Sequence, residues 1–192
     1  MKKKFLIVGR TASGKSTITR LAAEQLGLKV LKSYCTRPPR NDETESDHIF
    51  VKPEDVEKYR DRMIAYTDKV DEYVRFATID QLEEADFYII DPYGIEYLKS
   101  LHIPDMEFIE IYIRVPTMDL AKRASVRGDS MEIFDKRFYE ENEQFTQYEK
   151  SQNFKYHILN AGTINDSVVR LCNIVNKELY GDTKKKKGFW KR

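Results

Sequence analysis

At 192 residues, the chain has the length of one α/β domain with room for a full hydrophobic core. Hydrophobic residues make up 41% of it and charged residues 34%, the balance of a soluble globular protein. The formal net charge of +1 includes six basic residues and no acidic residue in 183–192, so the rest of the chain has a net charge of −5. That charge argues against a general nucleic-acid-binding surface and leaves room for a local basic cleft.

The cysteines and the apolar runs bear on the cellular compartment. Cys35 and Cys172 lack metal-ligand spacing and are too few for a disulfide framework, which suits a reducing environment. The four apolar residues 5–8 are too short for a signal-peptide core, and no stretch is long and apolar enough to span a membrane. We therefore expect a cytoplasmic monomer or homodimer without a stable nucleic-acid or membrane partner.

The first apolar run, Phe5–Val8, is typical of a short buried parallel strand that ends at a glycine. The eight residues after it fit the pattern G-x-x-x-x-G-K-[ST]. Gly9 and Gly14 let the backbone curl so that its amides point at a polyphosphate, Lys15 reaches the outer phosphates, and Ser16 ligates Mg²⁺. The helix that follows adds the positive end of its dipole. The predicted phosphate-binding loop consists of Gly9, Arg10, Thr11, Ala12, Ser13, Gly14, Lys15, Ser16 and Thr17.

Between the first helix and residue 78 the sequence predicts short strands around a stiff loop. A second strand, Lys29–Tyr34, leads into residues 35–40, where two prolines hold Arg37 and Arg40 on that loop. Residues 41–47 are polar and acidic, and are expected to be exposed. The further elements expected here are a strand at His48–Val51, a helix from Pro53, two strands within 63–76, and a brief helix opened by a capping box at Thr78–Gln81.

The second half of the chain alternates strands with helices. The expected strands are Phe87–Ile90, Phe108–Ile113 and Tyr156–Asn160, and the expected helices begin at Pro92, at Pro116, at Ser130 (ending at Phe145) and near Ile164. The last helix carries an apolar stripe at Ile164, Val168, Leu171, Cys172, Val175 and Leu179. This alternation predicts a mostly parallel sheet covered by helices on both faces. Because ligands bind beyond the carboxyl ends of such strands, Gly9, Arg37, Asp91 and Asn160 are expected to share one cleft.

Several short motifs resemble the guanylate kinase family. Residues 33–40, followed by Glu43 and by Asp47–Val51, are similar to its serine-rich strand end, its T-R-x-P-R, its glycine–glutamate pair and its aromatic residue before F-V. Asp91–Gly94 is similar to its D-x-x-G motif. The likeness continues at Lys122-Arg123, Arg127-Gly128 and Lys136-Arg137 of its lid helices, and at the asparagine Asn160 that ends its last strand. It runs in order from Phe5 to about Leu179.

The resemblance implies an α/β P-loop kinase core with a lid at about 124–140 and a small monophosphate-binding insertion at about 41–78. It implies one domain over residues 1–182, followed by a basic flexible tail at 183–192. The implied reaction is ATP-dependent, Mg²⁺-requiring phosphoryl transfer to a small phosphorylated acceptor, most simply a nucleoside monophosphate. The tail could contact nucleic acid or anionic lipid, but we favour a solvated terminus.

The resemblance also implies roles for single residues. Arg37 and Arg40 would hold the acceptor phosphate, bidentate where geometry permits, with Ser33, Glu43 and His48 on the same side. Arg127 and Arg137 would close over the transferring group. Arg123 and Asn160 would lie near the ATP base. Asp91 would cap the helix that begins at Pro92, orient Mg²⁺ or the acceptor, or do both.

The departures from the family bear on the acceptor. His48 stands where the family has a tyrosine that contacts the acceptor phosphate, and Ala65 lies nearest the place of its guanine-binding glutamate. The family's Y-G-[ST] is replaced by residues 74–76 or shifted to residues 73–75. Residues that hold phosphate persist and Ser33 remains as a possible base contact, while most of the residues that recognise guanine are missing. The sequence therefore favours a kinase more than a guanylate-specific one. Two alternatives stay open: a sugar-phosphate kinase such as a ribose bisphosphate kinase, and a non-catalytic guanylate-kinase-like binding module. The intact Lys15 and Ser16 argue against the second.

Overall fold

The computed structural model describes residues 1–39, 48–68, 73–126 and 128–181. Its core is a parallel four-stranded sheet in the order β6-β1-β7-β8, made of β1 (Lys2–Val8), β6 (Phe87–Ile89), β7 (Met106–Arg114) and β8 (Tyr156–Leu159). The central strands are apolar on both faces because helices cover both. The fold predicted from the alternation of strands and helices is confirmed.

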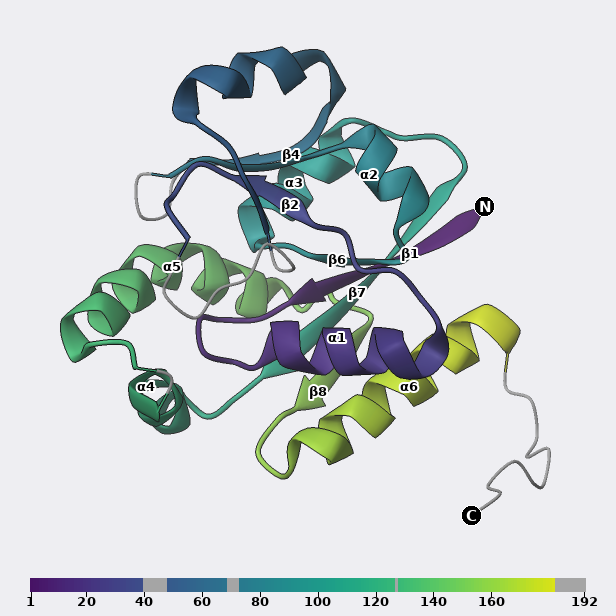
Figure 1. Cartoon of the computed structure of the whole chain (residues 1–192). Coiled ribbons are helices and arrows are strands. Elements are labelled where there is room, and N and C mark those ends of the chain that lie inside the picture. Colours follow the sequence, from purple (N-terminus) through teal and green to yellow (C-terminus); the bar gives the residue numbers. More distant parts are fainter. Residues whose placement is uncertain (40–47, 69–72, 127, 182–192) are drawn as a thin grey trace.

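Alternate residues of β1 enter two separate cores. Phe5 and Ile7 pack with α1 (Lys15–Leu26) and α6 (Ile164–Tyr180) on one face of the sheet. Leu6 and Val8 pack on the other face with α3 (Pro92–Ser100) and α5 (Met131–Ser151). Figure 1 shows α1 and α6 side by side beneath the core strands. The loop after β1 therefore emerges between the two layers, at the carboxyl edge of the sheet.

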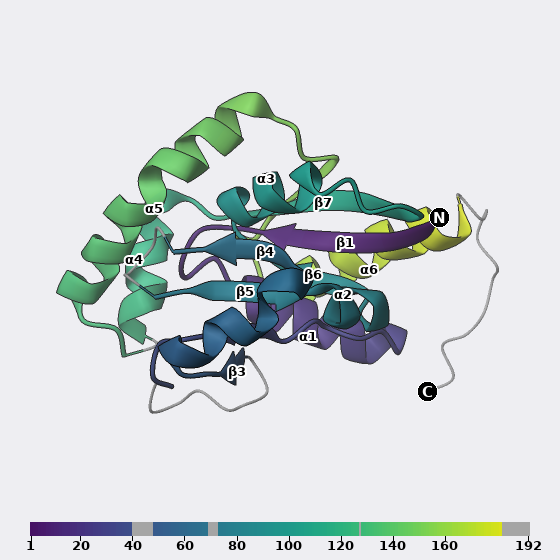
Figure 2. The same ribbon diagram turned by 90° about the horizontal axis from the view of Figure 1, so that it is seen from above.

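A second, smaller sheet lies over the face that α3 and α5 also cover. Its order is β3-β2-β5-β4, and its strands are β2 (Ser33–Cys35), β3 (His48–Phe50), β4 (Met63–Thr67) and β5 (Arg75–Thr78). Ile64, Ala65 and Ala77 join this sheet to the core of Leu6 and Val8. The 3₁₀ helix η1 (Pro53–Arg62) and α2 (Ile79–Glu84) complete this region, seen from above in Figure 2. It contains the described part of the predicted insertion.

The region around the predicted lid has a small core of its own. α4 (Thr117–Val126) and the start of α5 enclose Val115, Leu120, Ala124 and Phe134. This cluster is separate from the two cores that flank the sheet. Within the described ranges, no helix is long and apolar enough to cross a membrane.

Three predicted elements differ from the observed ones. The predicted strand Lys29–Tyr34 divides, because Val30 bridges to Phe87 of the core sheet while Ser33–Cys35 pairs within the second sheet. The helix expected from Pro53 is a 3₁₀ helix, since none of its ten residues is buried and no apolar face anchors an α-helix. The helix expected to end at Phe145 continues to Ser151, because Tyr148 is buried one turn further on.

The apolar stripe of the final helix is only partly buried. Val168, Leu171 and Val175 lie in the core, as predicted. Ile164 and Leu179 are 44% and 38% exposed, because they lie at the two ends of α6, where a neighbouring turn is missing on one side. The stripe thus contributes its middle turns to the core.

Candidate functional site

The loop after β1 has the tight backbone that its glycines predict. A Cβ on Gly9 would lie 2.6 Å from the Oγ of Ser13 and 2.9 Å from the carbonyl oxygen of Ile113, so a side chain there would clash. Gly14 has a φ of 82°, a left-handed conformation that favours glycine, and a Cβ there would lie 2.9 Å from Asn160 Nδ2. Ala12 also has a positive φ, 58°, and the Ser13 amide donates to the Arg10 carbonyl. The loop therefore curls back on itself between β1 and α1.

The helix that follows the loop begins at Lys15 with an open N-terminus. Its N-cap residue is Gly14, and no described side chain caps it. The first turn of a helix has amide groups without intrahelical acceptors, and together with the helix dipole they form an anion site. Ser16 is exposed in this turn, where its hydroxyl can ligate Mg²⁺. These residues fit the phosphates of ATP and a magnesium ion.

Two buried polar atoms of predicted site residues, one in the loop and one on α5, have no hydrogen-bond partner among the described residues. They are the Oγ of Ser13, inside the loop, and Nη1 of Arg137, from α5. An unpaired guanidinium nitrogen in a buried position is costly unless an acceptor fills the place. Both atoms support a phosphate ligand, and Arg137 was predicted as a phosphate-binding residue.

Asn160 and Arg123 hold the loop from the side of β8. Asn160 Nδ2 donates to the Ser13 carbonyl at 2.9 Å, and its Oδ1 accepts from Ser167 Oγ at 3.0 Å. Arg123 Nη2 donates to the main-chain oxygen of Asn160 at 2.7 Å. The predicted contact of Asn160 and Arg123 with the ATP base stays a prediction. Asn160 supports the loop directly, and Arg123 supports it through Asn160.

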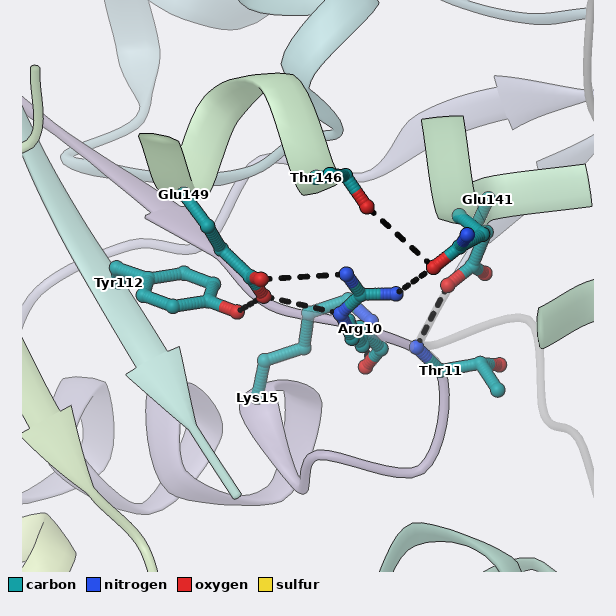
Figure 3. Close-up of polar contacts among 8 residues, drawn as sticks. Arg10, Thr11, Lys15, Tyr112, Glu141, Thr146 and Glu149 are labelled. Carbon is teal, nitrogen blue, oxygen red and sulfur yellow. Dashed lines mark hydrogen bonds and ion pairs between the residues drawn. The ribbon is translucent and has the colours of Figure 1, made fainter. Parts of the chain in front are cut away.

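Helix α5 holds the loop from the opposite side (Figure 3). Arg10 donates to Glu149 from Nε at 2.9 Å and from Nη2 at 3.3 Å, and its guanidinium lies over the rings of Phe138 and Phe145. Tyr112 from β7 also donates to Glu149. Burial alone would raise the pKa of Glu149, but the hydrogen bonds from Arg10 and Tyr112 bring it below its usual range.

Glu141 makes the closest contact between α5 and the loop. Its Oε2 accepts the backbone N–H of Thr11 at 2.8 Å, as Figure 3 shows. Burial raises the pKa of Glu141, while Lys15 and the Thr11 amide oppose that rise. Lys15 itself donates to the Arg10 carbonyl at 3.2 Å.

Asp91 lies between the loop and the second sheet. It caps α3 by accepting from the Gly94 amide at 2.7 Å, and the same Oδ1 accepts from Thr67 of β4 at 3.2 Å. Burial raises the pKa of Asp91, and the positive charges of Arg75 and Lys15 act in the opposite direction. The helix cap expected of Asp91 is therefore present. The carboxylate of Asp91 also interacts with a positive charge on each side, Lys15 of the loop and Arg75 of the second sheet.

The predicted acceptor residues lie on the second sheet. Arg37, only 6% exposed, has its guanidinium over the ring of Phe50 and donates to the Pro38 carbonyl at 2.9 Å. Ser33 Oγ and His48 Nδ1 lie 3.0 Å apart on adjacent strands. Arg40, Glu43 and Arg127, which were also predicted as site residues, lie outside the described residues.

Sequence reasoning missed several polar residues of this site. Glu141 and Glu149 belong to the charged helix, and only the apolar residues Phe138 and Phe145 at their helical spacing mark that face as buried. Arg75 lies in a segment that departs from the family, and no role was predicted for it. Its position in the site follows from the strand register, in which it lies opposite Thr67. The missed residues are Thr67, Arg75, Tyr112, Glu141, Asn142 and Glu149.

Comparisons with known proteins agree with this architecture. The guanylate kinase of Neisseria gonorrhoeae is 29% identical over 177 residues, which is 82% of this chain and 86% of that protein. The guanylate kinase of Neisseria meningitidis serogroup A is 30% identical over 141 residues, 69% of either chain. The chain belongs to the guanylate kinase family. No family model matches it.

A solved structure shows the same fold. The crystal structure of guanylate kinase from Anaplasma phagocytophilum superposes with a TM-score of 0.67 at 20% sequence identity, covering 93% of this chain and 87% of that one. The family membership predicted from the motifs is confirmed. The roles of individual site residues stay predictions.

Proposed function

We propose that this member of the guanylate kinase family is an ATP- and Mg²⁺-dependent kinase that phosphorylates a nucleoside monophosphate. The observation that carries the proposal is the position of Asp91. This carboxylate is a neighbour of Lys15 in the phosphate loop and of Arg75 in the second sheet. We therefore propose that the anion site at α1 and the sheet that carries Arg37 and Arg75 border one cleft, with Asp91 between them. The curated relatives bear the name guanylate kinase, which supports the same reaction.

Each side of the cleft supplies cations for one part of the reaction. The loop amides and Lys15 hold the outer phosphates of ATP, and Ser16 holds Mg²⁺. Bound ATP supplies the phosphoryl group, and Mg²⁺ neutralises charge on its phosphates. Arg137 directs its unpartnered Nη1 at the transferring group, and Arg37 holds the acceptor phosphate in a position fixed by Phe50. Positioning and charge neutralisation suffice, because the attacking phosphate oxygen is already ionised.

The second sheet does not determine which base the acceptor carries. Ala65 is 2% exposed and packs in the core, so it offers no polar group to guanine. The hydroxyl of Ser33 lies in hydrogen-bond contact with His48. Unpaired guanine edges in a closed pocket cost roughly 1–3 kcal/mol per group, so two lost contacts remove about a hundredfold of GMP selectivity. We therefore expect GMP not to be preferred by more than that factor.

A panel of acceptors tests the proposal. ADP formation is measured by a coupled assay with GMP, dGMP, AMP, CMP, UMP and dTMP, and with ribose phosphates. We expect turnover with at least one nucleoside monophosphate, and a loss of at least about a hundredfold in Lys15→Ala, which removes one preorganised charge. Turnover with ribose phosphates alone would identify a sugar-phosphate kinase. Absence of turnover with every acceptor would favour a binding module.

A further inference from the structure

Glu141 brings a negative charge to a loop that is otherwise built to hold anions. Its carboxylate accepts the Thr11 amide at 2.8 Å (Figure 3). Its charge also interacts with those of Lys15 and Arg10. A phosphate group would use the same two features, a backbone N–H of the loop and the field of Lys15. Glu141 is partly buried, so solvent screens this charge only weakly.

Glu149, a second acidic residue of α5 that contacts the loop, differs from Glu141 in its partners. The charge of Glu149 is balanced by Arg10, which donates two hydrogen bonds to it, and Tyr112 donates a third. Among the described residues Glu141 forms no such ion pair; its hydrogen bond goes to the neutral amide of Thr11, and Asp91 adds a second negative charge nearby. A carboxylate in this place opposes a bound polyanion.

Arg137 lies one helical turn before Glu141, and residues four apart share a helix face. Its Nη1 is buried without a partner among the described residues. One face of α5 therefore carries both Arg137, which has a free donor atom, and Glu141, which accepts the Thr11 amide. Both arrangements would change if an anion entered at the loop.

We propose that Glu141 competes with the outer phosphate of ATP for the Thr11 amide and for the field of Lys15, and thereby sets the affinity of the loop for ATP. The inference rests on the proposed function, because it takes ATP as the ligand of the loop. Bound ATP displaces the carboxylate from Thr11 and pairs with Arg137 instead. Because Glu141 belongs to α5, breaking its contact with Thr11 removes one attachment of this helix to the loop. ATP binding would therefore affect the position of α5.

The test is isothermal titration calorimetry of ATP and ADP with the full chain and with Glu141→Gln. Glutamine keeps an oxygen acceptor for Thr11 and removes the charge. We expect the Kd for ATP to fall by about tenfold or more, the effect of removing one poorly screened like charge, and the Kd for ADP to fall less. Glu143→Gln is the matched control: it makes the same charge change on an exposed residue of the same helix, and its Kd values should equal those of the parent chain.

Glu141→Ala provides a second variant should Glu141→Gln fail to fold, because it also removes the charge and is expected to tighten ATP binding. Equal or weaker ATP binding in the folded variants would overturn the inference and leave Glu141 as a brace of the loop. That result is distinct from failure of the proposed function, in which the parent chain turns over no nucleoside monophosphate. Absence of ATP binding in both the parent and the variants would overturn both.

Discussion

At the scale of single residues, Asn160 connects three parts of the site through one amide. Its Nδ2 holds the carbonyl of Ser13, its Oδ1 accepts from Ser167, and the side chain is 1% exposed. Asn160→Asp keeps the shape but turns the donor into an acceptor that faces a carbonyl oxygen. We expect a loss of about 2–4 kcal/mol in the free energy of unfolding, because the buried carboxylate oxygen that replaces Nδ2 faces the Ser13 carbonyl without a donor. Denaturant unfolding measures it.

The same variant should also weaken ATP binding, since the loop loses its support and gains a negative charge beside Gly14. Asn153→Asp makes the same change at an exposed position of the α5–β8 connection and should alter neither quantity by more than about 0.5 kcal/mol. Equal stabilities for the two variants would mean that Asn160 does not hold the loop.

Which site residues the sequence could reveal depends on how far apart their partners lie. Gly9, Gly14, Lys15 and Ser16 act within one local motif, so their spacing predicted them. Glu141 acts on Thr11, 130 residues away, through a contact that only the packing of α5 creates. Local periodicity holds no information on such a pair.

At the scale of elements, Glu178 joins α6 to two strands of the core sheet. Lys3 of β1 donates to it at 2.9 Å, and Lys155 and Tyr156 at the start of β8 donate to its other oxygen. Burial opposes its charge, but the hydrogen bonds from Lys155, Tyr156 and Lys3 lower the pKa of Glu178 to about 2. The carboxylate therefore stabilises the attachment of α6 while it is ionised.

This arrangement predicts a pH-dependent stability. The folded pKa lies below the ordinary value of a glutamate, so the contribution is complete above about pH 4.5 and is lost as the pH falls toward 2. Glu178→Gln should lower the free energy of unfolding at pH 7 by roughly 1–2 kcal/mol, allowing for solvent screening of the half-exposed lysines. Unfolding of both proteins at pH 7 and pH 3 measures the difference, which should shrink at pH 3. A difference that stays constant would contradict the ionic origin.

Most helices and strands were predictable because each has a local signal. The capping box at Thr78 and the proline after Asp91 both mark helices that the structure contains. The division of the predicted strand 29–34 was not predictable. Val30 and Tyr34 are both β-prone residue types. They belong to different sheets because Val30 pairs with Phe87 of β6, whereas Tyr34 pairs with Phe76 of β5.

At the scale of the whole molecule, the two sheets carry the two halves of the proposed site. The parallel sheet presents the phosphate loop, whereas the second sheet presents Arg37, and Asp91 lies between them. Figure 1 shows the second sheet above the core strands, with α5 running alongside. We therefore expect the two ligands of the proposed reaction to bind on separate layers, so that a defect in one layer leaves the other able to bind.

Arg37→Ala tests this division. Its guanidinium is buried against Phe50 on the second sheet, where it is proposed to hold the acceptor phosphate. We expect the KM for the acceptor to rise by about tenfold or more, because a charge-assisted contact to phosphate is lost, while the Kd for ATP stays within about twofold. Steady-state kinetics give the first quantity and calorimetry the second.

Two further variants separate the function of Arg37 from its packing. Arg37→Lys keeps the charge but not the planar fork, so its KM should lie between those of the parent and the alanine variant. Arg60→Ala removes an exposed arginine of η1 that pairs with Glu57, and should change neither constant. Equal weakening of ATP and acceptor binding in Arg37→Ala would place Arg37 on the ATP side of the cleft. In that case the second sheet would serve both ligands, and the acceptor phosphate would have to be held from another part of the chain.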